Sequence, residues 1–200
     1  METRFPGYST LAKRDSPSWN DATRVVIDKR LDHPPPRRFF IPEEWPTLLA
    51  LCDRIIPQTG EPKVPIANFV DAKMADDEGD GYRRANLPTM QEMWRRGLAA
   101  TDAEARLRFG AAFVDLPGGR QDDVLHAIQE GDVRAPAWVD VPAKDFFKSR
   151  VLHDVVAIYY AHPQAWDEMG FGGPASPRGY VRMGFDRRDP WDAVERKRDA

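Results

Sequence analysis

Apolar residues recur at helical spacing along most of the chain. Between Pro42 and Ile56 they fall at positions i, i+3, i+4 and i+7, which is the pattern of an amphipathic helix. The same period predicts further helices over 65–74, 87–105, 120–130 and 143–161. No set of segments alternates apolar and polar residues in the two-residue period of a strand. The pattern therefore predicts an all-α fold, with a compact bundle of about five to six helices.

Two of these segments allow more specific expectations. The stretch 143–161 is apolar over a wide face, so we expect it to be the central helix, with His153 as a buried or half-buried imidazole. Cys52 lies on the apolar face of the helix after Pro42, and this position predicts a thiol in the core.

The first 41 residues have a different character. A short helix is predicted at Ser18–Leu31, with Ser18 as its N-cap and the apolar residues from Trp19 to Val26 near helical spacing. Pro34–Pro36 then favour a stiff extended stretch. We expect residues 1–41 to form an extended partner-binding arm, 42–177 the helical body and 178–200 a C-terminal extension.

Composition and charge exclude several classes of protein. The chain has 200 residues, of which 42 % are hydrophobic and 30 % charged, as in ordinary globular proteins. One cysteine cannot form an internal disulfide or a cysteine-based zinc site. No apolar run is long enough for a membrane span, and basic residues are mixed with acidic ones, which argues against nucleic acid binding. The net charge of −3 combines basic ends with an acidic middle.

The N-terminus does not have the pattern of a secretory signal. Arg37-Arg38-Phe39-Phe40-Ile41 resembles the start of a twin-arginine signal, but Pro42, Glu43 and Glu44 follow instead of an apolar stretch. We interpret this stretch as a linker that leads into a helix. The chain is expected to carry no signal of its own, and to be cytoplasmic, or periplasmic if a partner carries it.

Known catalytic and cofactor motifs are missing from the sequence. It contains no His-Glu-x-x-His, no Gly-x-Ser-x-Gly and no phosphate-binding loop. Gly170–Ala175 has the spacing of a dinucleotide fingerprint, but a helix precedes it and Pro174 removes an N–H group, so nucleotide binding is not expected. The acidic turn 76–81 lacks the ligand alternation of an EF-hand. We therefore predict no metal, cofactor or catalytic residue in this chain.

An alternative is that the chain is an enzyme with His162, Asp167 and Glu168 as an acid/base set. Adjacent residues on a helix point in different directions, which weakens the pairing of Asp167 with Glu168. A third reading is a free-standing helical scaffold or chaperone.

The segment 159–180 is the most unusual part of the chain. It is rich in glycine, proline and aromatic residues, which favour a loop of fixed path that other groups can approach closely. Together with the aromatic residues of the arm it supplies the candidate partner-contact residues. These are Phe5, Tyr8, Trp19, His162, Trp166, Phe171, Gly172, Gly173, Pro174, Arg178 and Tyr180.

This segment carries a family resemblance. The residues are His162-Pro163-x-Ala165-Trp166-x-Glu168-x-Gly170-Phe171-Gly172-Gly173-Pro174-Ala175-x-Pro177-Arg178-Gly179-Tyr180. They resemble the C-terminal signature of the gluconate 2-dehydrogenase subunit 3 family, the small subunit of FAD-dependent sugar dehydrogenases. The start of the chain and Leu116-Pro117 before Arg120 are also similar to that family.

The resemblance implies a non-catalytic subunit that stabilises or chaperones a larger partner. That partner is a glucose-methanol-choline-type subunit, which holds FAD, oxidises a sugar hydroxyl and passes electrons to a cytochrome c subunit or another acceptor. A heterodimer with this subunit is the expected assembly. The missing signal and the long arm are similar to the branch of glucoside 3-dehydrogenases.

Overall fold

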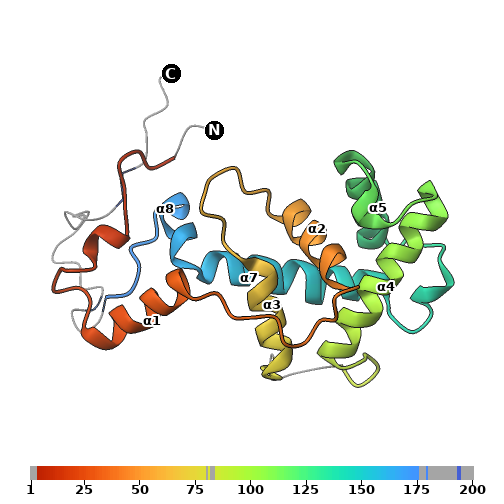
Figure 1. The fold of residues 1–200 in the computed structure, drawn as a ribbon, viewed down its shortest axis with the longest axis horizontal. Coiled ribbons are helices and arrows are strands. Elements are labelled where there is room, and N and C mark those ends of the chain that lie inside the picture. The colour runs from red at the N-terminus through yellow and green to blue at the C-terminus, as the bar shows by residue number, and fades with distance from the viewer. Residues whose placement is uncertain (1–3, 80, 82–83, 176–178, 180–192, 195–200) are drawn as a thin grey trace. The chain divides into compact units, whose positions relative to one another are not determined.

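A computed structural model describes the chain except for residues 1–3, 80, 82–83, 176–178, 180–192 and 195–200 (Figure 1). Within the described residues all regular structure is helical, which confirms the all-α prediction. None of the described helices is long and apolar enough to cross a membrane. Close contacts divide the chain into two units, one of residues 35–158 and one that combines residues 1–34 with 159–200. These boundaries differ from the expected ones at 41/42 and 177/178.

The unit of residues 35–158 contains most of the predicted helices (Figure 1). They are α2 (Trp45–Ile55), α3 (Ile66–Ala75), α4 (Met90–Phe109), α5 (Gly118–Glu130) and α6 (Ala143–Phe146). The apolar stripes found in the sequence are the buried faces, and Leu48, Val70 and Trp94 are each fully buried. Cys52 is buried as expected, and burial raises the pKa of its thiol.

The ends of these helices follow from local sequence. Thr89 and Glu92 form a capping box at the start of α4, and Gly131 ends α5 in the left-handed conformation, with φ of 72°. The expected i, i+4 pair forms between Asp102 and Arg106, with 2.9 Å between Oδ2 and Nε.

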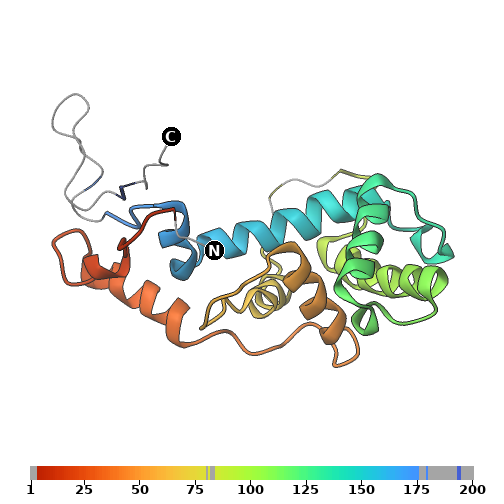
Figure 2. The same ribbon diagram turned by 90° about the horizontal axis from the view of Figure 1, so that it is seen from above.

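The predicted helix 143–161 is formed by three consecutive pieces. After α6 the chain makes a π-helical turn over Phe147–Leu152 and continues as α7 (His153–Ala161). Figure 2 shows these pieces as one long cyan ribbon. His153, expected to be buried or half-buried, has 52 % of its side chain exposed and lies beside Asp154, with 3.1 Å between Nδ1 and Oδ1.

Buried carboxylates join the helices of this unit to its loops. Asp71 accepts hydrogen bonds from three successive backbone N–H groups at residues 38–40. Glu104 accepts from the N–H groups of Arg134 and Ala135. Asp154 accepts from Lys73 Nζ and Trp94 Nε1, each at 2.8 Å. Asp71 and Glu104 thus satisfy backbone N–H groups of the loops, and Asp154 satisfies side-chain donors of α3 and α4.

The stretch that resembles a twin-arginine signal has a structural role in this unit. Arg38 makes two hydrogen bonds to Asp76, and Arg37 lies over the Trp45 ring at 5.7 Å. The stretch leads into α2, as the prediction of a linker requires.

Candidate functional site

The second unit joins the two ends of the chain and contains most of the candidate partner-contact residues. Its N-terminal part is residues 4–34, with a single 3₁₀ turn at Leu11–Lys13 and helix α1 (Asp21–Asp32). Its C-terminal part runs from Tyr159 through α8 (Trp166–Met169) to residue 175. We call it the terminal unit.

A row of backbone carbonyl groups in the C-terminal part accepts hydrogen bonds from the N-terminal part. Tyr8 Oη and Thr10 Oγ1 donate to the Phe171 oxygen at 3.1 Å and 2.9 Å. Lys13 Nζ donates to the Gly172 oxygen at 2.9 Å. Trp19 Nε1 donates to the Pro174 oxygen at 2.8 Å. The glycine- and proline-rich segment is thus held through its main chain by side chains more than 150 residues away.

Two glycines allow this close approach. Gly170 and Gly173 both have φ of +67°, in the region that side chains with a Cβ avoid. A Cβ on Gly170 would lie 2.6 Å from the Phe5 ring, and one on Gly173 would lie 2.4 Å from Thr10 Cγ2. The glycines of the motif therefore serve both the turn of the loop and its contact with the N-terminal part.

A small apolar core lies beneath this contact. Trp19, Ile27 and Trp166 are 2 %, 2 % and 5 % exposed and pack together, with Leu11 and Leu31 partly buried against them. The Trp166 ring also meets the Phe171 ring edge to face, with 5.6 Å between ring centroids. Each part of the terminal unit supplies one tryptophan, so neither part could form this core alone.

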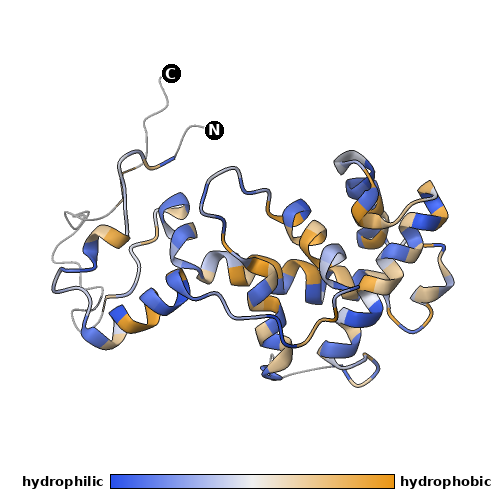
Figure 3. Ribbon diagram, viewed as in Figure 1, coloured by the Kyte–Doolittle hydropathy of each residue, from blue (hydrophilic) through white to orange (hydrophobic). Residues whose placement is uncertain are grey.

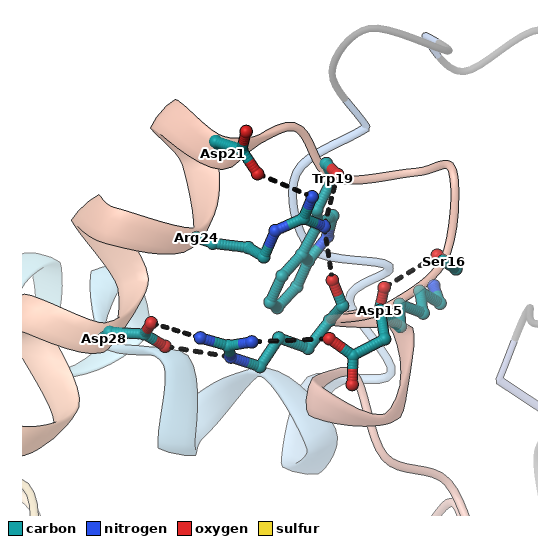
Figure 4. A network of polar contacts seen from close by, with 8 residues as sticks. Asp15, Ser16, Trp19, Asp21, Arg24 and Asp28 are labelled. Carbon is teal, nitrogen blue, oxygen red and sulfur yellow. Dashed lines mark hydrogen bonds and ion pairs between the residues drawn. The ribbon is translucent and has the colours of Figure 1, made fainter.

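Charged residues fix α1 to the preceding loop (Figure 4). Arg24 Nη1 donates to the Trp19 carbonyl oxygen, and Arg24 Nη2 pairs with Asp21 at 2.9 Å. Arg14 Nη2 pairs with Asp28 at 2.5 Å. The N-cap of α1 is Asn20, whose side chain accepts from Thr23 N at 2.9 Å. The predicted N-cap Ser18 was wrong by two residues.

His162 is part of the interior of the terminal unit. It is 3 % exposed, its Nε2 lies 3.0 Å from the Arg30 carbonyl oxygen, and its Nδ1 accepts from Gln164 N. This geometry fits a neutral imidazole with the proton on Nε2. Burial lowers the pKa of His162 and outweighs the hydrogen bond to Arg30, which favours the charged form.

The residues of the alternative acid/base set bond to different groups. Asp167 Oδ1 accepts from Thr10 N at 2.6 Å, and Glu168 Oε2 accepts from Tyr159 Oη at 2.7 Å. Burial raises the pKa of Tyr159, and the hydrogen bond to Glu168 raises it further. His162, Asp167 and Glu168 share no hydrogen bond in the described part of the chain. The described residues also contain no group of three or more His, Cys, Asp or Glu side chains placed to bind a metal ion.

The structure separates the predicted contact residues into groups. Trp19, His162, Trp166 and Gly173 are buried within the terminal unit, whereas Phe171 is 42 % exposed. Phe5, Tyr8, Gly172 and Pro174 are half-buried. Arg178 and Tyr180 lie outside the described residues. Partner contact by this set stays a prediction, but its tryptophans and His162 already pack against this chain.

Sequence reasoning missed the donors Thr10 and Lys13. Lys13 is only 7 % exposed, because its aliphatic part lies in the unit and its ammonium group reaches the Gly172 oxygen and the Tyr8 ring. Neither residue belongs to a motif, and a lysine two residues from Asp15 in a polar stretch carries no signal of burial.

A comparison with protein families shows to which family the chain belongs. The family model described as gluconate 2-dehydrogenase subunit 3 matches residues 42–173. The chain belongs to the gluconate 2-dehydrogenase subunit 3 family. No curated protein and no solved structure matches the chain. The gluconate 2-dehydrogenase subunit 3 match includes the C-terminal part of the terminal unit up to Gly173, whereas residues 4–34 lie outside it. A segment outside the family model thus contacts the C-terminal end of the matched region.

Proposed function

We propose that this chain is the non-catalytic small subunit of an FAD-dependent sugar dehydrogenase complex. In this role it binds and stabilises a large glucose-methanol-choline-type subunit, which carries FAD and oxidises a sugar hydroxyl. Electrons then pass to a cytochrome c or another acceptor. A 3-hydroxyl of a glucoside is the substrate class to test first.

The observation that carries this proposal is the family match over residues 42–173. The family is a subunit of a multi-subunit dehydrogenase complex, and the match spans nearly the whole unit of residues 35–158 and the motif that follows it. Membership therefore rests on the helical body as well as on the short glycine-rich motif.

The buried positions of several polar side chains support a role other than catalysis. Asp71, Glu104 and Asp154 are at most 1 % exposed and bind groups of this chain. His162, held by the Arg30 carbonyl oxygen, is buried in the same way. A general acid or base must reach the proton it transfers, and these groups face the interior.

Co-expression tests the proposal directly. The chain should be made with an affinity tag together with the large flavin-bearing subunit, and the purified material analysed by native mass spectrometry and visible absorption. We expect a fixed stoichiometry and the absorption bands of a flavin. The chain expressed alone should be less soluble and less stable than the chain in the complex.

Two results would reject the proposal. One is a stable, monomeric chain that never retains the flavin-bearing subunit. The other is oxidation of a sugar by the purified chain without any flavoprotein, which would favour the enzyme with His162, Asp167 and Glu168.

A further inference from the structure

The unit of residues 35–158 contains a pocket that no part of the account so far has used. Its volume is about 760 Å³, within the range of sites that bind small molecules. The loop after α3 and the first turn of α4 form part of its wall. The π-helical turn and the residue after it form the rest, through Lys148, Ser149, Arg150 and His153. Turns of this kind are rare and are frequent at functional sites. We call this cavity the π-turn pocket.

Apolar side chains at the start of α4 form one part of this wall. Leu87 and Met93 are 8 % and 3 % exposed, and Met90 is half-buried. Figure 3 shows hydrophobic and hydrophilic residues in succession along α4. Methionine side chains are flexible and polarizable, so they adapt to ligands of different shape. This part of the pocket can therefore take the apolar body of a ligand.

The π-helical turn supplies basic groups to the same pocket. Lys148 is exposed and has no hydrogen bond or ion pair with a described residue. Arg150 has 11 % of its side chain exposed, and its Nη1 lies 3.5 Å from Asp154 Oδ2. Because this carboxylate already orders the Arg150 side chain, little rotational freedom is lost when the guanidinium binds a ligand.

Asp154 does not neutralise all of its basic neighbours. It is 1 % exposed and pairs with Lys73 at 2.8 Å as well as with Arg150. His153 Nδ1 lies 3.1 Å from its Oδ1. One carboxylate therefore serves two permanent cations and an imidazole, which leaves a positive charge on this part of the wall.

The other charges of the π-turn pocket balance one another. Arg84 pairs with Asp145 at 3.2 Å. Asp77 lines the pocket from the loop after α3 and offsets the charge of Lys148. Glu78 on the same loop is exposed and is not part of the wall. With a neutral imidazole, the lining groups and their ion-pair partners thus carry one positive charge in excess, which matches a ligand with a single negative charge.

We propose that the π-turn pocket binds a small organic acid, with the carboxylate held by Arg150 and Lys148 and the apolar body against Met90 and Met93. A guanidinium fork and an ammonium group are donors that recognise carboxylates through charge-assisted hydrogen bonds. A pocket with an apolar wall and a few convergent polar groups is the usual form of a small-molecule site. This inference does not rest on the proposed function, which assigns no ligand to this chain.

Isothermal titration calorimetry of the full-length chain, free or in its complex, tests this with octanoate as the probe. Octanol, which lacks the charge, and inorganic phosphate, which lacks the apolar body, are the control ligands. Lys148→Glu reverses one charge of the wall, and Met90→Trp fills the space that the apolar body would occupy. Lys144→Glu is the matched control, because Lys144 is an exposed lysine one helical turn earlier that does not line the pocket.

We expect octanoate to bind the wild-type chain with a dissociation constant of about 1 mM or lower, as for a good ligand of this size. Lys148→Glu should weaken binding about tenfold or more, because repulsion replaces a charge-assisted contact. Met90→Trp should weaken it by a similar factor, and Lys144→Glu should leave it near wild type. Octanol and phosphate should bind about tenfold more weakly than octanoate, or less. The thermal midpoint of each variant without ligand serves as the folding control.

Three results would overturn this inference. The first is that the wild-type chain shows no saturable binding of octanoate. The second is equal affinity for octanoate in wild type and in either pocket variant, which would place the binding elsewhere. The third is that octanol or phosphate binds as tightly as octanoate, which would reject an organic acid as the ligand. Each of these results leaves the proposed function standing, because that function is tested by complex formation and not by this pocket.

Discussion

The indole N–H of Trp19 donates to the carbonyl oxygen of Pro174, 2.8 Å away and 155 residues later in the chain. The two residues belong to the segments that appeared least able to form a core. Each segment supplies a tryptophan, and the C-terminal part supplies carbonyl groups that accept hydrogen bonds from side chains of the N-terminal part. The terminal unit therefore depends on both ends of the chain.

Trp19→Phe should weaken the terminal unit while it keeps an aromatic ring in the core. The change leaves the Pro174 oxygen without this donor, at a cost of about 1 kcal/mol or more. Hydrogen exchange at residues 166–175 should become faster. Tyr8→Phe, which removes a longer and more exposed bond, should have a smaller effect. Equal exchange in Trp19→Phe and wild type would contradict this role of the indole.

Gly173→Ala tests the close approach of the N-terminal part. The new Cβ meets Thr10 Cγ2 and also has an unfavourable positive φ, so we expect a loss of about 2 kcal/mol or more in the terminal unit. Gly7→Ala is the control, because Gly7 has φ of +72° but no atom within 4 Å of a new Cβ. It should lose only about 1 kcal/mol. Chemical denaturation measures both losses of free energy. Similar losses for Gly173→Ala and Gly7→Ala would show that the contact with Thr10 is unimportant.

In the unit of residues 35–158, Gly97→Ala should destabilise although alanine favours helices. A Cβ there would lie 2.2 Å from the Phe146 ring, which is itself fully buried. We expect a loss of about 2 kcal/mol or more in the free energy of unfolding. Gly119→Ala near the start of α5 has open space and should be neutral or stabilise by about 0.5 kcal/mol. A thermal midpoint of Gly97→Ala at or above wild type would refute this packing.

His162 should make the stability of the terminal unit depend on pH. Its pKa is lowered in the folded chain, so the unfolded chain binds a proton more readily. The stability that the neutral His162 contributes is fully present above the ordinary histidine pKa of about 6.5. It is lost as the pH falls from there toward the lower pKa of His162 in the folded chain. Denaturation at pH 7.5 and 5.5 should show this loss.

Two variants isolate the contribution of His162. His162→Gln should reduce the difference between the two pH values, and His33→Gln, at an exposed position, should leave it unchanged. The same pH difference in His162→Gln and in wild type would assign the effect to other groups.

The sequence was sufficient to predict features that depend on residues close together in the chain. The helical period located α2 to α5, Gly131 marked a helix end, and Cys52 was correctly placed in the core. The π-helical turn at Phe147–Leu152 was not predicted, because α-helical and π-helical turns give the same sequence pattern within an apolar run.

Features that depend on long-range contacts were not predictable in this way. Asp71 and Glu104 are acidic residues on helices, where a charged side chain is normally assigned to solvent, yet both bind backbone N–H groups far along the chain. Ile27 rather than Val25 or Val26 is buried because Trp166 comes to lie against it. The helical period of α1 alone does not distinguish these choices.

The most direct measurement of the central claim is sugar-dependent reduction of an electron-acceptor dye by the flavin-bearing subunit, expressed with and without this chain. Glucosides should be included among the sugars. The account predicts that this chain raises the soluble yield and the total activity several-fold, while the chain alone reduces no dye. Equal yield and activity of the flavin-bearing subunit without this chain would contradict the account.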